Sequence, residues 1–269
     1  MMKKIQLMLS LALMISSGVV AQDRYFARTY TSDVLPKGRV DLELWHTSRF
    51  GHKGQFYHGQ DQRMEVEIGL GKNLQTAVYF NRFQTRYSEG SEGTVLDNQI
   101  GFSNEWKWKL RDPAAHKLGV SLYGEWGLKG GDELELETKL ILDKIFGKNL
   151  LAFNAVYEYE REFEWSNNKV ESGKLQTAEL DLGYQYFLKP GLGVGLELVN
   201  TNKISDEHGW EYAVLFGGPT LNFKKDKWFI ILNYLPQLGN LHQTVSAPAK
   251  KVLDDHERVE ARFIVGISL

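Results

Sequence analysis

The sequence contains no cysteine. This absence excludes disulfide bonds, thiolate metal sites, cysteine nucleophiles and a lipid anchor on an N-terminal cysteine. Long apolar runs are also absent beyond residue 21, and the mean hydropathy of −0.35 is too polar for a helical membrane protein. Basic residues are not in excess, since the formal net charge is −2, so nucleic acid is not expected as a partner.

The first 21 residues have the three parts of a secretory signal peptide. Lys3 and Lys4 form the basic part, residues 5–15 form a short apolar core, and Val19-Val20-Ala21 forms a cleavage site. An anchored N-terminal helix is the alternative, but the apolar core is shorter than the roughly 20 residues that span a bilayer. We therefore expect export, and a mature chain that begins near residue 22.

Beyond residue 38 the chain alternates between apolar and polar residues, which indicates β-strands with one apolar face. The final stretch, 257–269, shows this most clearly, because Val259, Ala261, Phe263, Val265 and Ile267 share one parity. Twelve strands are expected, over residues 39–49, 62–70, 74–87, 95–110, 118–128, 133–146, 150–165, 175–187, 194–200, 210–223, 228–235 and 257–269. An even number of long amphipathic strands is typical of bacterial outer-membrane barrels.

The fold class that follows is all-β: a closed, antiparallel, up-and-down transmembrane β-barrel over residues 39–269. Residues 22–38 are expected to form a periplasmic lead-in that ends in a Pro-Lys-Gly turn. The connections differ in length, which is typical of short periplasmic turns and longer outer loops. Compact connections are expected at 71–73, 147–149 and 224–227, and longer ones at 50–61, 166–173, 201–209 and 236–256. Both termini are therefore expected in the periplasm.

Alternation alone does not say whether the apolar face meets lipid or a soluble core. Strand length favours the membrane, and so do aromatic residues near the strand ends, which are typical of interfacial girdles. These aromatic residues are Trp45, Tyr87, Trp165 and Trp210 toward the longer connections, and Trp108, Phe146, Phe187, Phe223 and Trp228 toward the shorter ones. A secreted soluble barrel or sandwich remains the alternative.

If the apolar face meets lipid, the polar parity lines the lumen. The expected lumen-lining residues are Asp41, Glu43, Glu65, Glu67, Glu105, Glu125, Glu135, Glu137, Glu158, Glu179, Glu197, Arg258, Glu260 and Arg262. This acid-rich set is compatible with a filled, salt-bridged lumen or with a water-filled pore that prefers cations. We also expect charge pairs across the closing seam, between the last strand and Asp41 or Glu43 of the first.

Two kinds of chemical site were considered. Five histidines, His46, His52, His58, His242 and His256, lie in or beside the first and last long connections. These connections are neighbours in a closed barrel, so the five histidines are low-ranking candidates for metal ligands. An outer-leaflet lipid hydrolase would need a serine and a histidine near the outer rim. Candidate pairs are His46 with Ser48, and Ser205 with His208. Neither motif has a diagnostic spacing, so no catalytic residue, metal site or cofactor is expected.

The start of the expected mature chain has a distinctive pattern. It contains the run Tyr-Thr-Ser-Asp-Val-Leu-Pro-Lys-Gly over residues 30–38, followed by Asp41-x-Glu43-x-Trp45 and by an Arg-x-Glu-x-Glu pattern from residue 63. This pattern resembles a family of uncharacterised Gram-negative outer-membrane β-barrel proteins. The resemblance covers about the first fifth of the chain. It implies location in the outer membrane and a barrel fold, and it carries over no activity and no catalytic residues. This sequence departs from the usual aromatic last residue, because Leu269 stands there.

The function expected from these observations is a channel or transport-related barrel for small polar or cationic solutes. The alternatives are a structural or ligand-binding barrel with a plugged polar lumen, and an outer-leaflet lipid hydrolase. Outer-membrane lipid is an expected partner, and so is the barrel-assembly machinery, which would bind the C-terminal strand.

Overall fold

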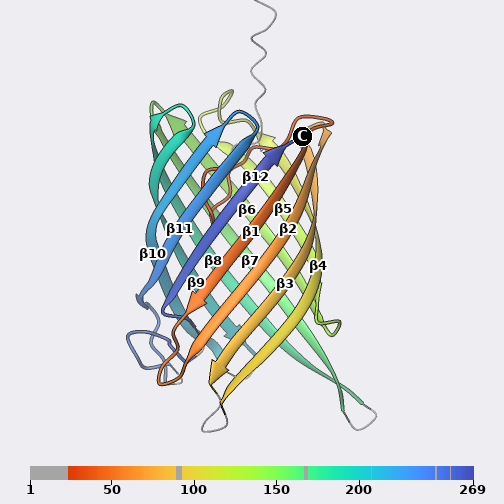
Figure 1. Ribbon diagram of the computed structural model, residues 1–269, viewed down its shortest axis with the longest axis vertical. Helices are drawn as coiled ribbons and strands as arrows, with labels where there is room; N and C mark the ends of the chain where they lie inside the picture. Colours follow the sequence, from red (N-terminus) through yellow and green to blue (C-terminus); the bar gives the residue numbers. More distant parts are fainter. Residues whose placement is uncertain (1–23, 89–92, 167–168, 207, 246, 255) are drawn as a thin grey trace, which may run out of the picture.

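The computed structural model describes residues 24–269 except 89–92, 167–168, 207, 246 and 255. The expected signal peptide over 1–21 lies outside these residues. Twelve antiparallel strands form a closed barrel in which each strand pairs with its neighbours along the chain and β1 pairs with β12 (Figure 1). The strands are β1 (Val40–Phe50), β2 (Tyr57–Gly71), β3 (Leu74–Ser88), β4 (Thr94–Arg111), β5 (Gly119–Lys129), β6 (Glu133–Phe146), β7 (Asn149–Ser166), β8 (Lys169–Lys189), β9 (Leu192–Ser205), β10 (Gly209–Lys225), β11 (Trp228–Asn240) and β12 (Val259–Ser268). The predicted fold class is confirmed.

Within the part of the chain that the structure describes, no helix is long and apolar enough to cross a membrane.

Most turns at the upper end of Figure 1 are tight, as the sequence predicts, whereas the connection between β4 and β5 spans residues 112–118. Between β2 and β3, Lys72 and Asn73 have φ angles of 52° and 63°, the left-handed conformation of a two-residue hairpin turn. Gly147 starts the β6–β7 turn with a φ angle of 60°. The C-terminus lies at this same end (Figure 1).

The connections at the opposite end differ from expectation, because most of their residues belong to strands. β2 begins at Tyr57, β8 begins at Lys169, and β9 continues to Ser205. The expected long loops at 50–61, 166–173 and 201–209 are therefore largely hairpin extensions, whereas the connection between β11 and β12 remains long. Polar residues can extend a hairpin past a membrane surface, so polarity alone did not mark the strand ends.

The barrel has an apolar outer face and a polar inner face. Large outward side chains such as Phe80, Ile100 and Leu196 are exposed by 52%, 77% and 57%, whereas inward Glu65 and Glu105 are fully buried. The outer surface is thus the reverse of a soluble barrel, as lipid contact requires. Trp228, Trp210, Trp108 and Phe146 lie on the outer face at the strand ends.

Trp45 is an exception to the predicted girdles. It has the inward parity of Glu43 and Thr47, and it is only 7% exposed. Its indole nitrogen donates a hydrogen bond of 2.8 Å to the Glu43 carboxylate. A girdle residue needs the outward parity, and the position of Trp45 near a strand end did not reveal its parity.

The closing seam does carry a charge pair, but not the expected one. The antiparallel register places Asp41 and Glu43 opposite Ser268 and Gly266, at the C-terminal end of β12. Glu260 instead lies opposite Arg49, and the guanidinium Nε of Arg49 is 3.3 Å from its carboxylate. Because β12 runs antiparallel to β1, the C-terminal end of β12 lies beside the start of β1. The charged first part of β12 therefore lies beside the end of β1, near the other rim.

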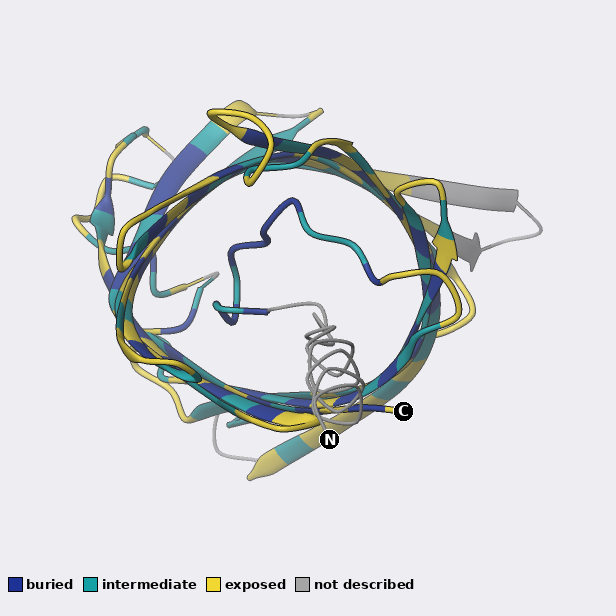
Figure 2. Ribbon diagram, turned by 90° about the horizontal axis from the view of Figure 1, so that it is seen from above, coloured by how far each residue is buried: buried dark blue, intermediate teal, exposed yellow. Residues whose placement is uncertain are grey.

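The largest departure concerns residues 24–38, expected as a periplasmic lead-in. Residues 24–35 lie inside the barrel and cross its lumen (Figure 2). They contact wall residues near the tight turns, such as Gln75 and Asn222. Phe26 and Ala27 are fully buried, and Leu35 is 2% exposed. Residues 24–35 are called the plug segment below. The aromatic side chains of the plug segment are shielded from water inside the barrel, whereas those of a free lead-in would be exposed to it.

Candidate functional site

The plug segment has no regular secondary structure, so its backbone groups need partners from the barrel wall. Wall side chains supply them. Glu197 on β9 accepts the Ala27 amide at 2.9 Å, and Asn154 on β7 accepts the Tyr30 amide at 2.7 Å and donates to the Tyr30 carbonyl at 3.0 Å. Further wall contacts come from Asn222 to the Arg24 carbonyl, Asp143 to the Ser32 amide, Ser121 to the Ser32 carbonyl and Gln75 to the Leu35 amide. Inward polar residues on strands from β3 to β10 therefore hold one segment.

Two inward glycines make room for the plug segment. Phe26 packs over Gly183, where an added Cβ would lie 2.9 Å from the Phe26 ring. The carbonyl of Pro36 passes over Gly69 so closely that any side chain there would collide with it. Larger residues at these two positions would exclude the segment from its present path.

Tyr30 is the centre of a cluster of aromatic rings and cations. Its ring packs edge-on against Tyr123 at 5.6 Å, the guanidinium of Arg24 lies 4.4 Å from its centroid, and the ammonium group of Lys139 lies 4.6 Å away. Burial raises the pKa of Tyr30 to about 12, although Arg24 and Lys139 act to lower it. The phenol is therefore neutral at physiological pH, and its ring can stabilise the cations around it.

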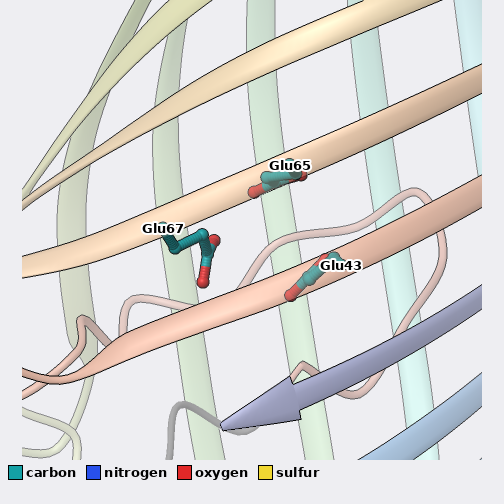
Figure 3. Close-up of side chains that lie close together, drawn as sticks. All are labelled: Glu43, Glu65 and Glu67. Atoms are coloured by element: carbon teal, nitrogen blue, oxygen red, sulfur yellow. The ribbon is translucent and has the colours of Figure 1, made fainter. Parts of the chain in front are cut away.

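Three carboxylates on the first two strands lie close together (Figure 3), and Arg24 approaches two of them. Glu43 on β1 and Glu65 and Glu67 on β2 are buried, and one oxygen of each lies within 4.8 Å of the others. The Arg24 guanidinium is 3.3 Å from Glu43 and 4.0 Å from Glu67. Like charges repel when they face each other across a strand pair, as Glu43 and Glu65 do, so Arg24 stabilises this wall when the plug segment is in place.

A second group of acids forms a belt across four neighbouring strands. Glu105, Glu125, Glu137 and Glu158 are direct register partners from β4 to β7, and all point inward. The cations nearest the belt are Lys139, 3.0 Å from Glu137, and Arg63, 4.0 Å from Glu125. Four carboxylates in one row give the lumen a negative potential that attracts cations.

Two cavities adjoin the plug segment. One has a volume of about 220 Å³ and is lined by the plug residues Arg28 and Tyr30 together with Arg49, Arg63 and the acidic belt from Glu125 to Glu158. The other is larger, about 490 Å³, and is lined by the plug residue Arg28, by residues of β1 and of β7 to β12, and by the β11–β12 connection. The barrel thus combines a segment packed across one half with polar space beyond it.

The structure places nearly all of the predicted lumen-lining residues on the inner face. Those that contact the plug segment are Glu43, Glu67, Glu179, Glu197, Glu260 and Arg262, and those that line the cavities include Glu125, Glu135, Glu137 and Glu158. Asp41, Glu65 and Glu105 are buried in the half of the barrel that the plug segment occupies. Arg258 is different, because it precedes β12 and is exposed.

The five histidines do not form a common cluster. His52 stacks on Tyr57 at 3.6 Å, His242 stacks on Trp210 at 3.8 Å, and His58 stacks on Phe50 at 4.6 Å. His256 packs against Tyr212. The group with metal-ligand spacing among the described residues consists of glutamates alone. The two connections are neighbours in the barrel, but their histidines do not meet, since four of the five rings pack on aromatic partners and His46 contacts Ser48.

Of the two serine–histidine pairs, one has contact between its side chains. The His46 ring nitrogen Nε2 lies 3.0 Å from the Ser48 hydroxyl on β1. Both have the outward parity of Leu44. In the other pair, the Ser205 hydroxyl accepts a hydrogen bond from the backbone amide of His208, not from its ring.

The plug segment was missed by sequence analysis, although the sequence contains two signals of it. The expected lead-in carries Phe26, Tyr30 and Leu35, which are more apolar than a free linker needs. Several strands are also apolar on both faces, as in Phe229 to Leu232 of β11, where Phe229 and Ile231 point inward and are buried. Inward apolar side chains indicate that something other than water fills the lumen.

Comparison with solved structures shows the same fold at low sequence identity. The COG4313 outer membrane channel from Pseudomonas putida F1 matches with a TM-score of 0.60 and 13% identity, over 88% of this chain and 98% of that chain. The translocator domain of the autotransporter NalP from Neisseria meningitidis matches with a TM-score of 0.58 and 10% identity, over 98% and 95%. The NanC porin matches with a TM-score of 0.52 and 12% identity, over 85% and 100%.

The comparison with curated proteins gives no match. A protein family matches over residues 18–269, which is nearly the whole chain, and its description is "Family of unknown function (DUF6662)". This span includes the plug segment as well as all twelve strands. The chain therefore belongs to the DUF6662 family, whose barrel resembles those of outer-membrane channels and porins.

Proposed function

We propose that this protein is a channel for small polar solutes, with a preference for cations, in the outer membrane of a Gram-negative bacterium. The observation that carries the proposal is an acid-lined lumen with cavities on one side of a single plug segment. The segment is held by hydrogen bonds and ion pairs rather than by a covalent link, so it can move without breaking the barrel wall. In this arrangement residues 24–35 keep the channel closed.

The orientation follows from the two ends of the barrel. The tight turns, the C-terminus and the entry of the plug segment lie at one end, which we assign to the periplasm because periplasmic turns are short in such barrels (Figure 1). Both termini are then periplasmic. The apolar outer face contacts outer-membrane lipid, and the C-terminal strand is the part that the barrel-assembly machinery would bind.

The preference for cations has a direct electrical test. When the lumen conducts, planar-bilayer recordings in a KCl gradient should give a reversal potential that indicates cation selectivity. Changing Glu125→Gln and Glu137→Gln together should shift this potential toward zero, because the belt loses two of its four acidic groups. Thr85→Ser, on the inner face of β3 and remote from the belt, serves as the matched control. Selectivity unchanged by the double substitution would refute the role of the belt.

A structural or ligand-binding barrel with a permanently plugged lumen is the runner-up. Heat-modifiable mobility on electrophoresis shows whether refolded protein has formed its barrel. Protein that folds by this criterion but never conducts, even without its plug segment, would favour the runner-up and contradict the channel.

The hydrogen-bonded pair His46 and Ser48 gives the hydrolase alternative one specific observation. A serine hydroxyl 3.0 Å from an imidazole nitrogen is the geometry of nucleophile activation. We nevertheless propose that the protein is not an enzyme, because residues with the same strand parity two positions apart often contact each other. Deacylation of phospholipid and lipopolysaccharide should therefore stay at background in the wild type and in Ser48→Ala alike. Activity that Ser48→Ala abolishes would overturn this assignment.

A further inference from the structure

The cavity of about 490 Å³ has two walls of opposite character. One wall is apolar and comes from Val199, Tyr212, Phe216 and Leu235, which form a buried cluster with Val252 of the β11–β12 connection. Such side chains are unexpected in the lumen of a polar pore, where they would face water. Their presence indicates a surface that suits an apolar or aromatic group.

The facing wall is acidic. Glu158 and Glu160 of β7 and Glu179 of β8 line the cavity. Glu179 is paired with Arg28 at 2.9 Å. Glu158 and Glu160 hydrogen-bond to each other, and no ion pair joins either of them to a cation among the described residues. A cationic ligand would therefore give this pair of acids the cation partner that the described wall does not provide.

The cations that line the cavity are already paired with other acids. Arg28 and Arg49 both approach Glu260, at 3.6 Å and 3.3 Å, and Lys203 approaches Glu211 at 3.7 Å. An anionic ligand would have to compete with these carboxylates and would also meet Glu158 and Glu160. The charge of the lining thus favours a cation over an anion.

We propose that this cavity is a binding site for a small organic cation that carries an apolar ring, such as an arylalkylammonium ion. The ring would pack on Tyr212 and Phe216, and the ammonium group would hydrogen-bond to Glu158 and Glu160. A charged hydrogen bond and burial of the ring together provide more affinity than either alone. The volume is within the range of about 300–1,000 Å³ that is usual for small-molecule sites. The inference deepens the proposed function, because it names the solute class for a cavity on the proposed path.

The test compares three compounds on the refolded full-length chain by titration calorimetry, with protein-free micelles as the blank. 2-Phenylethylamine carries both features, 3-phenylpropionate has the same ring with a negative charge, and ethylammonium has the charge without a ring. We expect saturable binding of 2-phenylethylamine, and binding of the other two compounds that is weaker by about tenfold or more. Equal binding of all three compounds would overturn the inference.

Variants separate the two walls. Glu158→Gln with Glu160→Gln should weaken 2-phenylethylamine binding by about tenfold or more, since a hydrogen bond to a charged group is lost. Phe216→Leu should weaken it less, and the affinity difference between 2-phenylethylamine and ethylammonium should shrink. Glu133→Gln, which changes an acid of β6 that lines neither cavity, is the matched control and should bind normally. A loss of binding in the control as large as in the double variant would refute local recognition.

Failure of this inference is distinguishable from failure of the channel, because the titration does not depend on ion flow. A cation-selective channel whose cavity does not discriminate among the three compounds overturns only the ligand class. Discriminating binding that is lost in the double variant supports the site, whether or not the barrel conducts.

Discussion

Deletion of residues 24–35 is expected to open the barrel and raise its single-channel conductance on the order of tenfold or more, given the lumen that twelve strands enclose. The deleted residues cross the lumen of the barrel (Figure 2). The wall stays closed without them because every strand pairs with two other strands. Planar-bilayer recording of the full chain and the deletion variant measures the effect, and heat-modifiable mobility shows that both have folded.

A disulfide provides the matched control for this deletion, since the chain has no cysteine of its own. A Cβ built on Gly119 would touch the hydroxyl of Ser32 on the plug segment. Ser32→Cys with Gly119→Cys should therefore tie the segment to β5. Under oxidising conditions this variant should stay closed, and reduction should restore the behaviour of the parent chain. Equal conductance in the oxidised variant and the deletion variant would show that the segment does not close the lumen.

A positive charge on the outer face should damage the barrel far more than the same charge on the inner face. Leu180 on β8 points outward and is 47% exposed, whereas Thr177 on the same strand lines both cavities. Leu180→Arg should destabilise the folded barrel by roughly 2–4 kcal/mol, the cost of an arginine near the bilayer midplane. Thr177→Arg can place its charge beside the carboxylates of the lumen, so its effect should be much smaller.

Urea unfolding of the two variants in lipid vesicles gives the comparison, with tryptophan fluorescence as the signal. The two substitutions introduce the same side chain three residues apart on one strand, so the charge of the chain changes equally. Similar losses of unfolding free energy in both variants would mean that the outer face of β8 does not contact lipid.

The alternation of apolar and polar residues along the strands allowed most of the barrel wall to be predicted from sequence. Along β12, Phe263 and Ile267 are exposed outward and Glu260 is buried inward, as their parity indicates. The tight turns were also predictable, because Lys72-Asn73 is a local signal that a two-residue hairpin needs. The limits of β8 and β9 were not predictable, since polar residues beyond the membrane can continue a hairpin or form a loop.

The sequence by itself determined the number of strands, the tight turns and the face of the barrel that is polar, because each depends on residues close together in the chain. Tertiary structure alone decided what meets the polar face. Glu197 accepts the amide of Ala27 across 170 residues of sequence, and Asn154 holds Tyr30 across 124. Strand parity shows that such a side chain points inward. It does not show whether water or another part of the chain meets that side chain, because the partner is set by barrel closure and by the path of a segment without regular structure.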